Sequence, residues 1–412
     1  MSVTIPGRRA CVTGCGVLSP IGNSTAAFWD ALLAGRCGLG PIRSFDTTGM
    51  SVACAGEVKD FEPAQWLSPA EIDRFDRLHQ FSLFAARAAL ADAQLDLAAV
   101  DRAQIGVIVS TSLGAMHIGE VYQRAPARGG AAFDARHLFD FPYYAVANTL
   151  ARKLGVRGPV VSPSIACASG TQAVGQALEF IRLGYGDVFL VGGVETLCAF
   201  VVNGFNCLRA TTPDTVRPFD ARRSGLLLGE GAAILIVEER EHARARGARI
   251  DVEVMGNGLA GDATHMTAPA RDGAGAARAM RMALADAGLT PADVGFVSAH
   301  GTGTVYNDAM EIAAIRRVFG ACATRIPVNS IKAAIGHTLA AAGAFEAIMC
   351  AHILRTGMIP ATLNCEQLDP ACTFDLVRAV ARRGEVRVAL STSSAFAGNN
   401  AAIVLRQGPS EE

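Results

Sequence analysis

A repeated alternation of short apolar runs, glycine-rich turns and amphipathic segments constrains the fold of this chain more than any other feature. Residues 105–110 form an apolar run of strand length, and the stretch around Trp29–Leu33 has helical character. Such alternation is typical of α/β architecture with largely buried sheets. A charged segment rich in Arg and Ala, residues 238–249, separates two such series. The sequence therefore predicts two α/β halves, residues 1–249 and 250–412.

The two predicted halves share a weak internal similarity. In the first half, residues 160–161 lead through a turn of small residues to Cys167 and then into a helical segment. In the second half, residues 326–328 lead to Lys332 and His337 and then into an Ala-rich helical segment. Both stretches have the pattern of a strand, a turn with reactive side chains, and a helix. We hypothesise that packing of the two halves brings these turns together in one cleft.

Composition limits the classes of protein to which the chain belongs. With 37 Lys plus Arg against 38 Asp plus Glu in 412 residues, the net charge is −1, which argues against a nucleic-acid scaffold. Half of the residues are hydrophobic, which excludes global disorder. The 11 cysteines include no Cys-x-x-Cys pair, and no apolar stretch approaches the ~20 residues of a membrane span. We therefore expect a soluble cytoplasmic protein that binds neither nucleic acid nor a membrane.

Cys167 is the first candidate for chemistry. It lies at a predicted junction between a strand and a helix, among Ala166, Ala168 and Gly170. A thiol at a helix N-terminus is near free backbone N–H groups and the positive end of the helix dipole, so we expect its pKa to be lowered. Its small neighbours permit a sharp turn similar to a nucleophile elbow. The alternative interpretation is a small buried core residue, which is the commoner fate of a free cysteine.

His300 lies where an apolar strand meets the loop Gly301–Thr304. Open α/β sheets bind their ligands at such carboxyl ends of strands. The hydroxyl groups of Thr302 and Thr304 are candidates to hold a polar arm of a substrate. The following stretch Asp308–Glu311 has the spacing of a capping box, which predicts a helix start there. A core histidine bonded to a carbonyl is the alternative.

His337 opens a further predicted helix, and Lys332 precedes it. A helix N-terminus disfavours the imidazolium, so we expect His337 to be neutral. Lys332 is a candidate for the electrostatic orientation of the site, and its alternative is a solvated surface lysine.

Three other signals are rejected. Gly256-Asn-Gly258-Leu-Ala-Gly261 matches a dinucleotide fingerprint, but a loop-like segment rather than a helix follows it. The eight His residues include no metal-binding pair with helical spacing, so we expect no metal site. A phosphate-binding Gly-x-x-x-x-Gly-Lys-Ser/Thr motif is also missing from the sequence.

The junctions of Cys167, His300 and His337, in that order, resemble those of one family. The other matching motifs cover nearly the whole chain: Val12–Gly16, Ser19–Gly22, Gly192–Glu195, Arg217–Asp220, Leu228–Gly231, Asn329–Lys332 and Glu346. In these motifs the chain resembles the β-ketoacyl-[acyl carrier protein] synthases of the thiolase-like superfamily. It is similar to the elongating type, which includes synthase II and the ketosynthases of type II polyketide systems.

This resemblance implies a fold of two similar halves in five layers, helix–sheet–helix–sheet–helix, and a homodimer or a heterodimer with a homologous subunit. It implies that Cys167 accepts an acyl chain from an acyl carrier protein as a thioester. His300 and His337 then hold malonyl-carrier protein while CO2 is lost, and the resulting carbanion attacks the acyl-Cys carbonyl. The phosphopantetheine arm comes from the carrier protein, so we expect no cofactor of the protein's own.

The resemblance also assigns supporting residues. The backbone N–H groups of Cys167 and Phe396 form the oxyanion hole, and Phe396 is also the gate. Lys332, Glu346 and Asp308 support the site, with Glu311 as a further candidate. Leu113 and Phe205 line the acyl pocket. Arg74 and Arg77 are candidates for carrier-protein docking, with an ordinary solvated helix face as the alternative.

One departure from the family concerns the C-terminal loop. The family sequence is usually Gly-Phe-Gly-Gly-Thr-Asn, whereas this chain has Ala395-Phe396-Ala397-Gly398-Asn399-Asn400. Two added Cβ atoms restrict the loop, which favours a specialised polyketide or polyene pathway over primary fatty-acid synthesis. Two alternatives remain. One is a non-extending or ester-forming acyltransferase of the same fold, and the other is a mainly structural subunit of a ketosynthase heterodimer.

Overall fold

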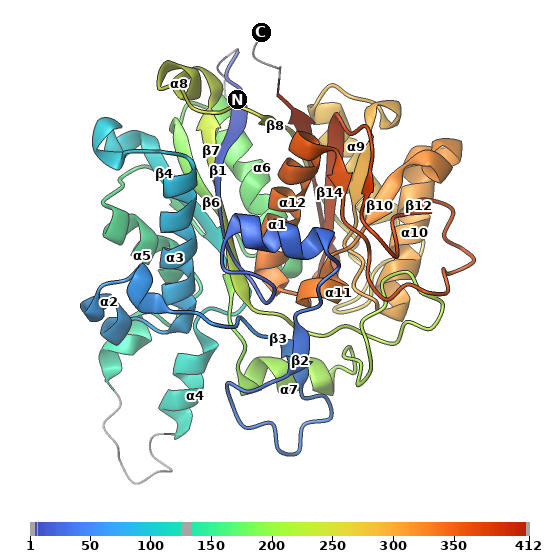
Figure 1. The fold of residues 1–412 in the computed structure, drawn as a ribbon, viewed down its shortest axis with the longest axis horizontal. Coiled ribbons are helices and arrows are strands. Elements are labelled where there is room, and N and C mark those ends of the chain that lie inside the picture. Colours follow the sequence, from blue (N-terminus) through green and yellow to red (C-terminus); the bar gives the residue numbers. More distant parts are fainter. Residues whose placement is uncertain (1–4, 6, 125–133, 409–412) are drawn as a thin grey trace.

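The computed structural model describes residue 5, residues 7–124 and residues 134–408. In the N-terminal half, five strands form a mixed array in the order β5-β4-β6-β7-β1 (Figure 1). These strands are β1 Ala10–Leu18, β4 Ile105–Ser110, β5 Val160–Val161, β6 Val188–Glu195 and β7 Gly231–Glu239. β4 runs parallel to β5 and β6, whereas β7 runs antiparallel to β6 and β1.

The C-terminal half repeats this arrangement in the order β10-β9-β14-β15-β8, with short β12 at its edge. Its strands are β8 Val252–Gly261, β9 Phe296–Ser298, β10 Pro327–Asn329, β12 Asp375–Leu376, β14 Val388–Ser394 and β15 Asn399–Gln407. The strand directions match those of the first half, position by position. β1 and β8 pair antiparallel over Ala10–Val12 and join the two arrays. The predicted internal similarity is therefore confirmed, while the boundary between residues 249 and 250 stays a prediction.

Two helices, α6 and α12, lie between the halves. They pack on each other, and each contacts strands of both arrays. α3 and α5 cover the other face of the N-terminal array, and α9 and α10 cover that of the C-terminal array (Figure 1). The bounds of these helices are α3 Arg77–Asp92, α5 Ala145–Leu154, α6 Ser169–Arg182, α9 Ala274–Asp286, α10 Val305–Phe319 and α12 Ala342–Thr356. The predicted five-layer α/β fold is confirmed.

Glycines bring the outer helices close to the strands in both halves. A Cβ atom on Gly16 of β1 would lie 2.0 Å from the Ala85 carbonyl oxygen of α3, and one on Gly258 of β8 would lie 2.1 Å from that of Ala279 in α9. Neither position therefore tolerates a larger residue without movement of a helix. Residues 256–261 lie inside β8, and two glycines of the pattern, Gly256 and Gly258, pack closely on α9.

The remaining elements are short and lie around this core. They are α1 Thr25–Leu33, β2 Leu39–Pro41, β3 Cys54–Gly56, α2 Pro69–Arg74, α4 Met116–Arg124, α7 Ala199–Cys207, α8 Arg240–Ala245, α11 Lys332–Ile335, β11 Met358–Ile359 and β13 Arg382–Arg383. Among the described residues, one helical segment, Leu339–Thr356, is apolar and long enough to span a bilayer, but 83% of it is buried inside the protein. Its apolar character is explained by its place in the central layer.

Candidate active site

Cys167 lies in a single 3₁₀ turn, Ala166–Ala168, between β5 and the first residue of α6. Ala166 has a φ of +52°, a left-handed conformation that a residue with a Cβ atom adopts at a cost. The backbone therefore turns sharply at the residue before the thiol, as the elbow interpretation predicts. Cys167 is buried and packs in an apolar cluster, as the core interpretation predicts, while its role as a nucleophile stays a prediction.

The prediction of a lowered thiol pKa is wrong. Burial raises the pKa of the Cys167 thiol to about 12, although the Lys332 ammonium and the backbone N–H groups of Cys167 and Phe396 act in the opposite direction. Removal of the sulfur from water therefore outweighs its place at a helix N-terminus. Both backbone groups favour negative charge at this point, which fits the oxyanion hole that the resemblance assigns to Cys167 and Phe396.

His300 and His337 face each other. Their ring centroids are 5.1 Å apart, and the rings meet edge to face. Both are buried, and burial followed by the charge of Lys332 lowers the pKa of each imidazole well below its ordinary value of 6.5. The predicted neutral state of His337 is therefore confirmed, although the cause that dominates is burial. The Nδ1 atom of each ring has no hydrogen-bond partner among the described residues.

The turn that carries Cys167 contacts the turn Leu339–Ala341, which directly follows His337 and Thr338, as the internal similarity predicts. Leu228 belongs to the apolar cluster around Cys167, and its backbone forms a β-bridge with His337. The charge of Lys332 acts on the pKa of Cys167, His300 and His337 alike. One buried cation therefore influences the thiol and both imidazoles.

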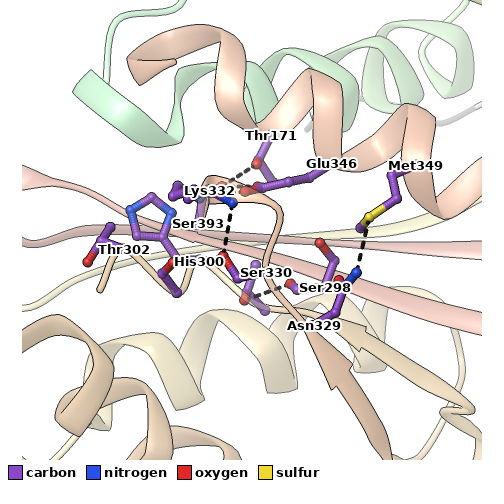
Figure 2. Close-up of polar contacts among 12 residues, drawn as sticks. Thr171, Ser298, His300, Thr302, Asn329, Ser330, Lys332, Glu346, Met349 and Ser393 are labelled. Carbon is purple, nitrogen blue, oxygen red and sulfur yellow. Dashed lines mark hydrogen bonds and ion pairs between the residues drawn. The ribbon is translucent and has the colours of Figure 1, made fainter. Parts of the chain in front are cut away.

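Lys332 is not a solvated surface residue. It is 2% exposed, and its Nζ donates to Glu346 Oε1 at 2.5 Å. Ser393 Oγ lies 3.5 Å from Glu346 Oε2 and 2.7 Å from Thr171 Oγ1 on α6. Figure 2 shows these side chains directed toward one another between the central helices and the sheet, with His300 beside them. The network links the first turn of α6, which follows Cys167, to Lys332 after β10.

The helix near Asp308 begins earlier than predicted. α10 starts at Val305, with Thr304 as its N-cap, so Asp308 and Glu311 lie inside the helix. Asp308 accepts from the N–H groups of Phe219 at 2.8 Å and Gly303 at 3.2 Å. Burial raises the pKa of its carboxyl. Asp308 therefore fixes the loop that follows His300.

Glu311 holds the same loop more directly. Its Oε1 accepts from the His300 N–H at 2.6 Å, and its Oε2 accepts from the Gly301 N–H at 2.8 Å. Burial raises the pKa of Glu311 to about 7. The hydroxyl groups of Thr302 and Thr304 lie 2.9 Å apart. Thr302 is buried, and Figure 2 places it beside the ring of His300, whereas the Thr304 hydroxyl caps α10.

The predicted pocket residues lie at the apolar cluster to which Cys167 belongs. Leu113 and Phe205 pack against the apolar cluster that contains Cys167. The ring of Phe396 stacks on that of Phe205, with centroids 5.7 Å apart and planes 22° apart. The predicted gate residue therefore closes against the predicted pocket lining.

The two alanines of the gate loop differ in conformation. Ala395 is extended, with a φ of −131°, and can hold a side chain without strain. Ala397 has a φ of +64°, where glycine is favoured, and its N–H donates to the Met266 carbonyl at 2.6 Å. Asn400 holds the loop from behind by donating to Asp262 Oδ1 at 2.8 Å. The restriction predicted for this loop therefore lies at Ala397.

Glu195 is a residue of the site to which sequence reasoning gave no role. It is buried at the end of β6, and burial raises the pKa of its carboxyl to about 7. It accepts from the N–H of Ser112, from the Thr111 hydroxyl at 3.1 Å and from the Ala340 N–H at 3.3 Å. The signal that could have found it was a charged residue at the end of an otherwise apolar strand.

The proposed docking arginines make internal contacts. Arg74 pairs with Asp140, and Arg77 pairs with Glu230 at 2.6 Å. Docking of a carrier protein by these two residues stays a prediction. Among the described residues, no group of three or more His, Cys, Asp or Glu side chains is arranged to hold a metal ion.

Comparison with known proteins gives consistent matches. Residues 8–243 match the family described as "Beta-ketoacyl synthase, N-terminal domain", and residues 252–366 match "Beta-ketoacyl synthase, C-terminal domain". The 3-oxoacyl-[acyl-carrier-protein] synthase 2 of Staphylococcus aureus (strain COL) is 37% identical over 97% of this chain and 98% of its own length.

Two solved structures are also similar. The ishigamide ketosynthase/chain length factor superposes with a TM-score of 0.93 and 40% identity, over 98% of this chain and 100% of the other. A type II PKS ketosynthase bound to the hexaketide, in complex with its acyl-carrier protein, superposes with a TM-score of 0.89 and 32% identity. That match covers 97% of this chain and 99% of the other.

Proposed function

The chain belongs to the β-ketoacyl synthase family and is a condensing acyltransferase, and we propose that Cys167, His300 and His337 carry out its reaction. The reaction is a decarboxylative Claisen condensation between an acyl group on Cys167 and malonyl-acyl carrier protein. One observation carries this proposal. The charge of Lys332 acts on the pKa of a buried thiol, Cys167, and of two buried neutral imidazoles, His300 and His337.

The first step is transfer of the acyl group. The Cys167 sulfur attacks the thioester carbonyl of the acyl-carrier protein, and a new carbon–sulfur bond forms. The bond to the pantetheine sulfur breaks, and that sulfur takes the proton that Cys167 loses. The N–H groups of Cys167 and Phe396 stabilise the negative oxygen of the intermediate. Because the thiol rests in its neutral form, the charge of Lys332 is needed to make the thiolate accessible.

The second step is decarboxylation and condensation. Neutral His300 and His337 donate N–H groups to the thioester oxygen of the malonyl group. The bond to the carboxylate breaks, CO2 leaves, and the electron pair remains as an enolate. The α-carbon then attacks the acyl carbonyl, and Cys167 departs as the thiolate. Because both imidazoles are neutral, each donates its N–H to the enolate oxygen and neither has to lose a proton first. Such donors stabilise the enolate strongly in a site that excludes water.

The pathway is a specialised one, polyketide or polyene assembly. This is supported by Ala397 in the gate loop and by similarity to a type II PKS ketosynthase, at a TM-score of 0.89 and 32% identity. A Cβ atom in the left-handed conformation limits the ways in which the loop opens. The protein uses no cofactor of its own, since the phosphopantetheine arm arrives on the carrier protein.

The partners are an acyl carrier protein and a homologous subunit. Exposed apolar side chains gather near α4 and α7, namely Val121, Phe139, Tyr143, Tyr144 and Phe200. A cavity of about 840 Å³ lies between these two helices. β5 lies at the end of the sheet, with Val160 exposed. A face of this kind is typical of a subunit interface. Light scattering of the protein, with and without a co-expressed homologue, measures this association.

Incubation with acyl-carrier proteins of graded chain length tests the proposed reaction. Intact-protein mass spectrometry is expected to show one acyl adduct on Cys167, and addition of malonyl-carrier protein is expected to give the extended β-ketoacyl product. An adduct without extension indicates the ester-forming or non-extending alternative. Absence of any adduct indicates a structural subunit and contradicts the proposal.

A further inference from the structure

We propose that Glu195 is a positioning residue that holds the segments of Leu113 and Leu339 against the acyl-binding cluster around Cys167. The inference rests on the proposed function, because it assigns a role in the binding of the acyl chain. Glu195 ends β6 in the N-terminal half, and its carboxylate reaches both halves of the molecule.

The first arm of this contact fixes the loop after β4. Glu195 accepts from the Ser112 N–H and from the Thr111 hydroxyl, and that hydroxyl in turn accepts from the Gly114 N–H at 3.3 Å. Leu113 lies between these donors in the sequence and packs on the Cys167 cluster. The position of Leu113 therefore depends on the carboxylate.

The second arm fixes the segment after His337. The Ala340 N–H donates to Glu195 Oε1 at 3.3 Å, directly after Leu339. Leu339 has a φ of +48°, a left-handed conformation that a leucine adopts only when its surroundings impose it. A Cβ atom on Gly193 would lie 2.7 Å from the Ala340 carbonyl oxygen, so β6 packs closely on this turn. Leu339 is a buried member of the Cys167 cluster.

The carboxylate is also an electrostatic neighbour of the nucleophile. Its charge raises the pKa of the Cys167 thiol, while the charge of Lys332 lowers it. Glu195 has no cation among its hydrogen-bond partners in the described part of the chain, and its contacts are backbone N–H groups and a hydroxyl. Substitutions of Glu195 can therefore separate the effect of its side-chain length from the effect of its negative charge.

Two variants separate them. Glu195→Gln keeps the length and an acceptor oxygen for Ser112 and Ala340, while Thr111 rotates to accept from the new amide. Glu195→Asp keeps the charge but withdraws the carboxylate by one methylene. Glu71→Ala is the control, since it removes a different buried carboxylate that caps α2 and pairs with Arg87.

The readout is the rate of Cys167 acylation by acetyl- and by dodecanoyl-carrier protein, followed by intact mass. Glu195→Asp is expected to lower the rate for the long primer by about tenfold relative to the short one, because small displacements of a binding wall are costly. Glu195→Gln is expected to keep the wild-type ratio of the two rates and to speed iodoacetamide alkylation of Cys167 about threefold at pH 8. Glu71→Ala is expected to lower the melting temperature only.

The inference is overturned if Glu195→Asp has the same ratio of dodecanoyl to acetyl acylation rates as the wild-type protein. The experiment also distinguishes this failure from failure of the proposed function. If wild-type Cys167 takes no acyl group, the proposed function fails. If it is acylated and the aspartate variant keeps the wild-type ratio, only the role of Glu195 fails.

Discussion

The turn after β5 and the turn after β10 occupy equivalent places in the two halves, yet they carry different chemistry. Each follows the third strand of its array and leads to a central helix. Each has a left-handed residue directly before the reactive side chain, Ala166 before Cys167 and Gly336 before His337. The second turn contains an additional short helix, α11, which begins with Lys332. The two turns therefore match in position, while α11, present only in the second turn, carries the cation whose charge acts on Cys167, His300 and His337.

Loss of either imidazole is expected to have the largest effect. His300→Ala or His337→Ala removes a donor to the enolate oxygen, so CO2 release from malonyl-carrier protein is expected to fall about 10²- to 10³-fold. Acylation of Cys167 is expected to persist, because that step uses the other turn. Parallel assays of CO2 release and adduct mass check this. An equal loss of Cys167 acylation and of CO2 release would contradict the assignment of these two steps to different turns.

Removal of the shared cation is expected to destabilise the protein. Lys332→Met leaves the Glu346 carboxylate buried without its cation, at a cost of about 3 kcal/mol in the free energy of unfolding. Burial already raises the pKa of Glu346, so this carboxyl is poorly solvated. The double variant Lys332→Met/Glu346→Gln is expected to recover part of the loss. Urea titrations of both variants give the comparison, and a double variant no more stable than the single one would argue against the pair.

The pH dependence of thiol reactivity follows from burial. With the pKa of Cys167 raised to about 12, the thiolate fraction grows with pH throughout the accessible range. Iodoacetamide alkylation is expected to rise about tenfold per pH unit from pH 7 to pH 10. A plateau of the rate below pH 9 would show that the first turn already holds a thiolate.

The smallest effect is expected at Ala166, one of the two residues with a positive φ that precede the reactive side chains. Ala166→Gly removes a Cβ atom from a strained conformation and is expected to raise the free energy of unfolding by up to about 1 kcal/mol. Gly336→Ala is the contrasting variant, because its Cβ atom would lie 2.4 Å from the Leu228 carbonyl oxygen. Thermal unfolding of both variants is expected to show shifts of opposite sign. Shifts of the same sign would mean that the turns are not equivalent.

Much of this arrangement could be predicted from the sequence because it depends on pattern. Apolar runs, small-residue turns and the charged segment at residues 238–249 predict the two halves, and the motifs around Cys167, His300 and His337 carry the resemblance to the family. The neutral state of His337 also followed from its position, although burial proved to be the stronger cause.

The rest depends on burial and on contacts that sequence does not show. The pKa of Cys167 was predicted in the wrong direction because the depth of the thiol is a tertiary property. The sequence offers no reason to rank Glu311 above Asp308, yet Glu311 accepts from the backbone N–H of His300 itself. Glu195 was missed as a site residue because its partners, Ser112 and Ala340, lie far from it along the chain.

One measurement tests the central claim that the two turns divide the reaction between nucleophile and enolate. In Cys167→Gln, the first turn has no nucleophile while His300 and His337 remain. CO2 release from malonyl-carrier protein is expected to continue, with no acyl adduct and no extended product. An extended product, or complete loss of CO2 release in a folded variant, would contradict this division.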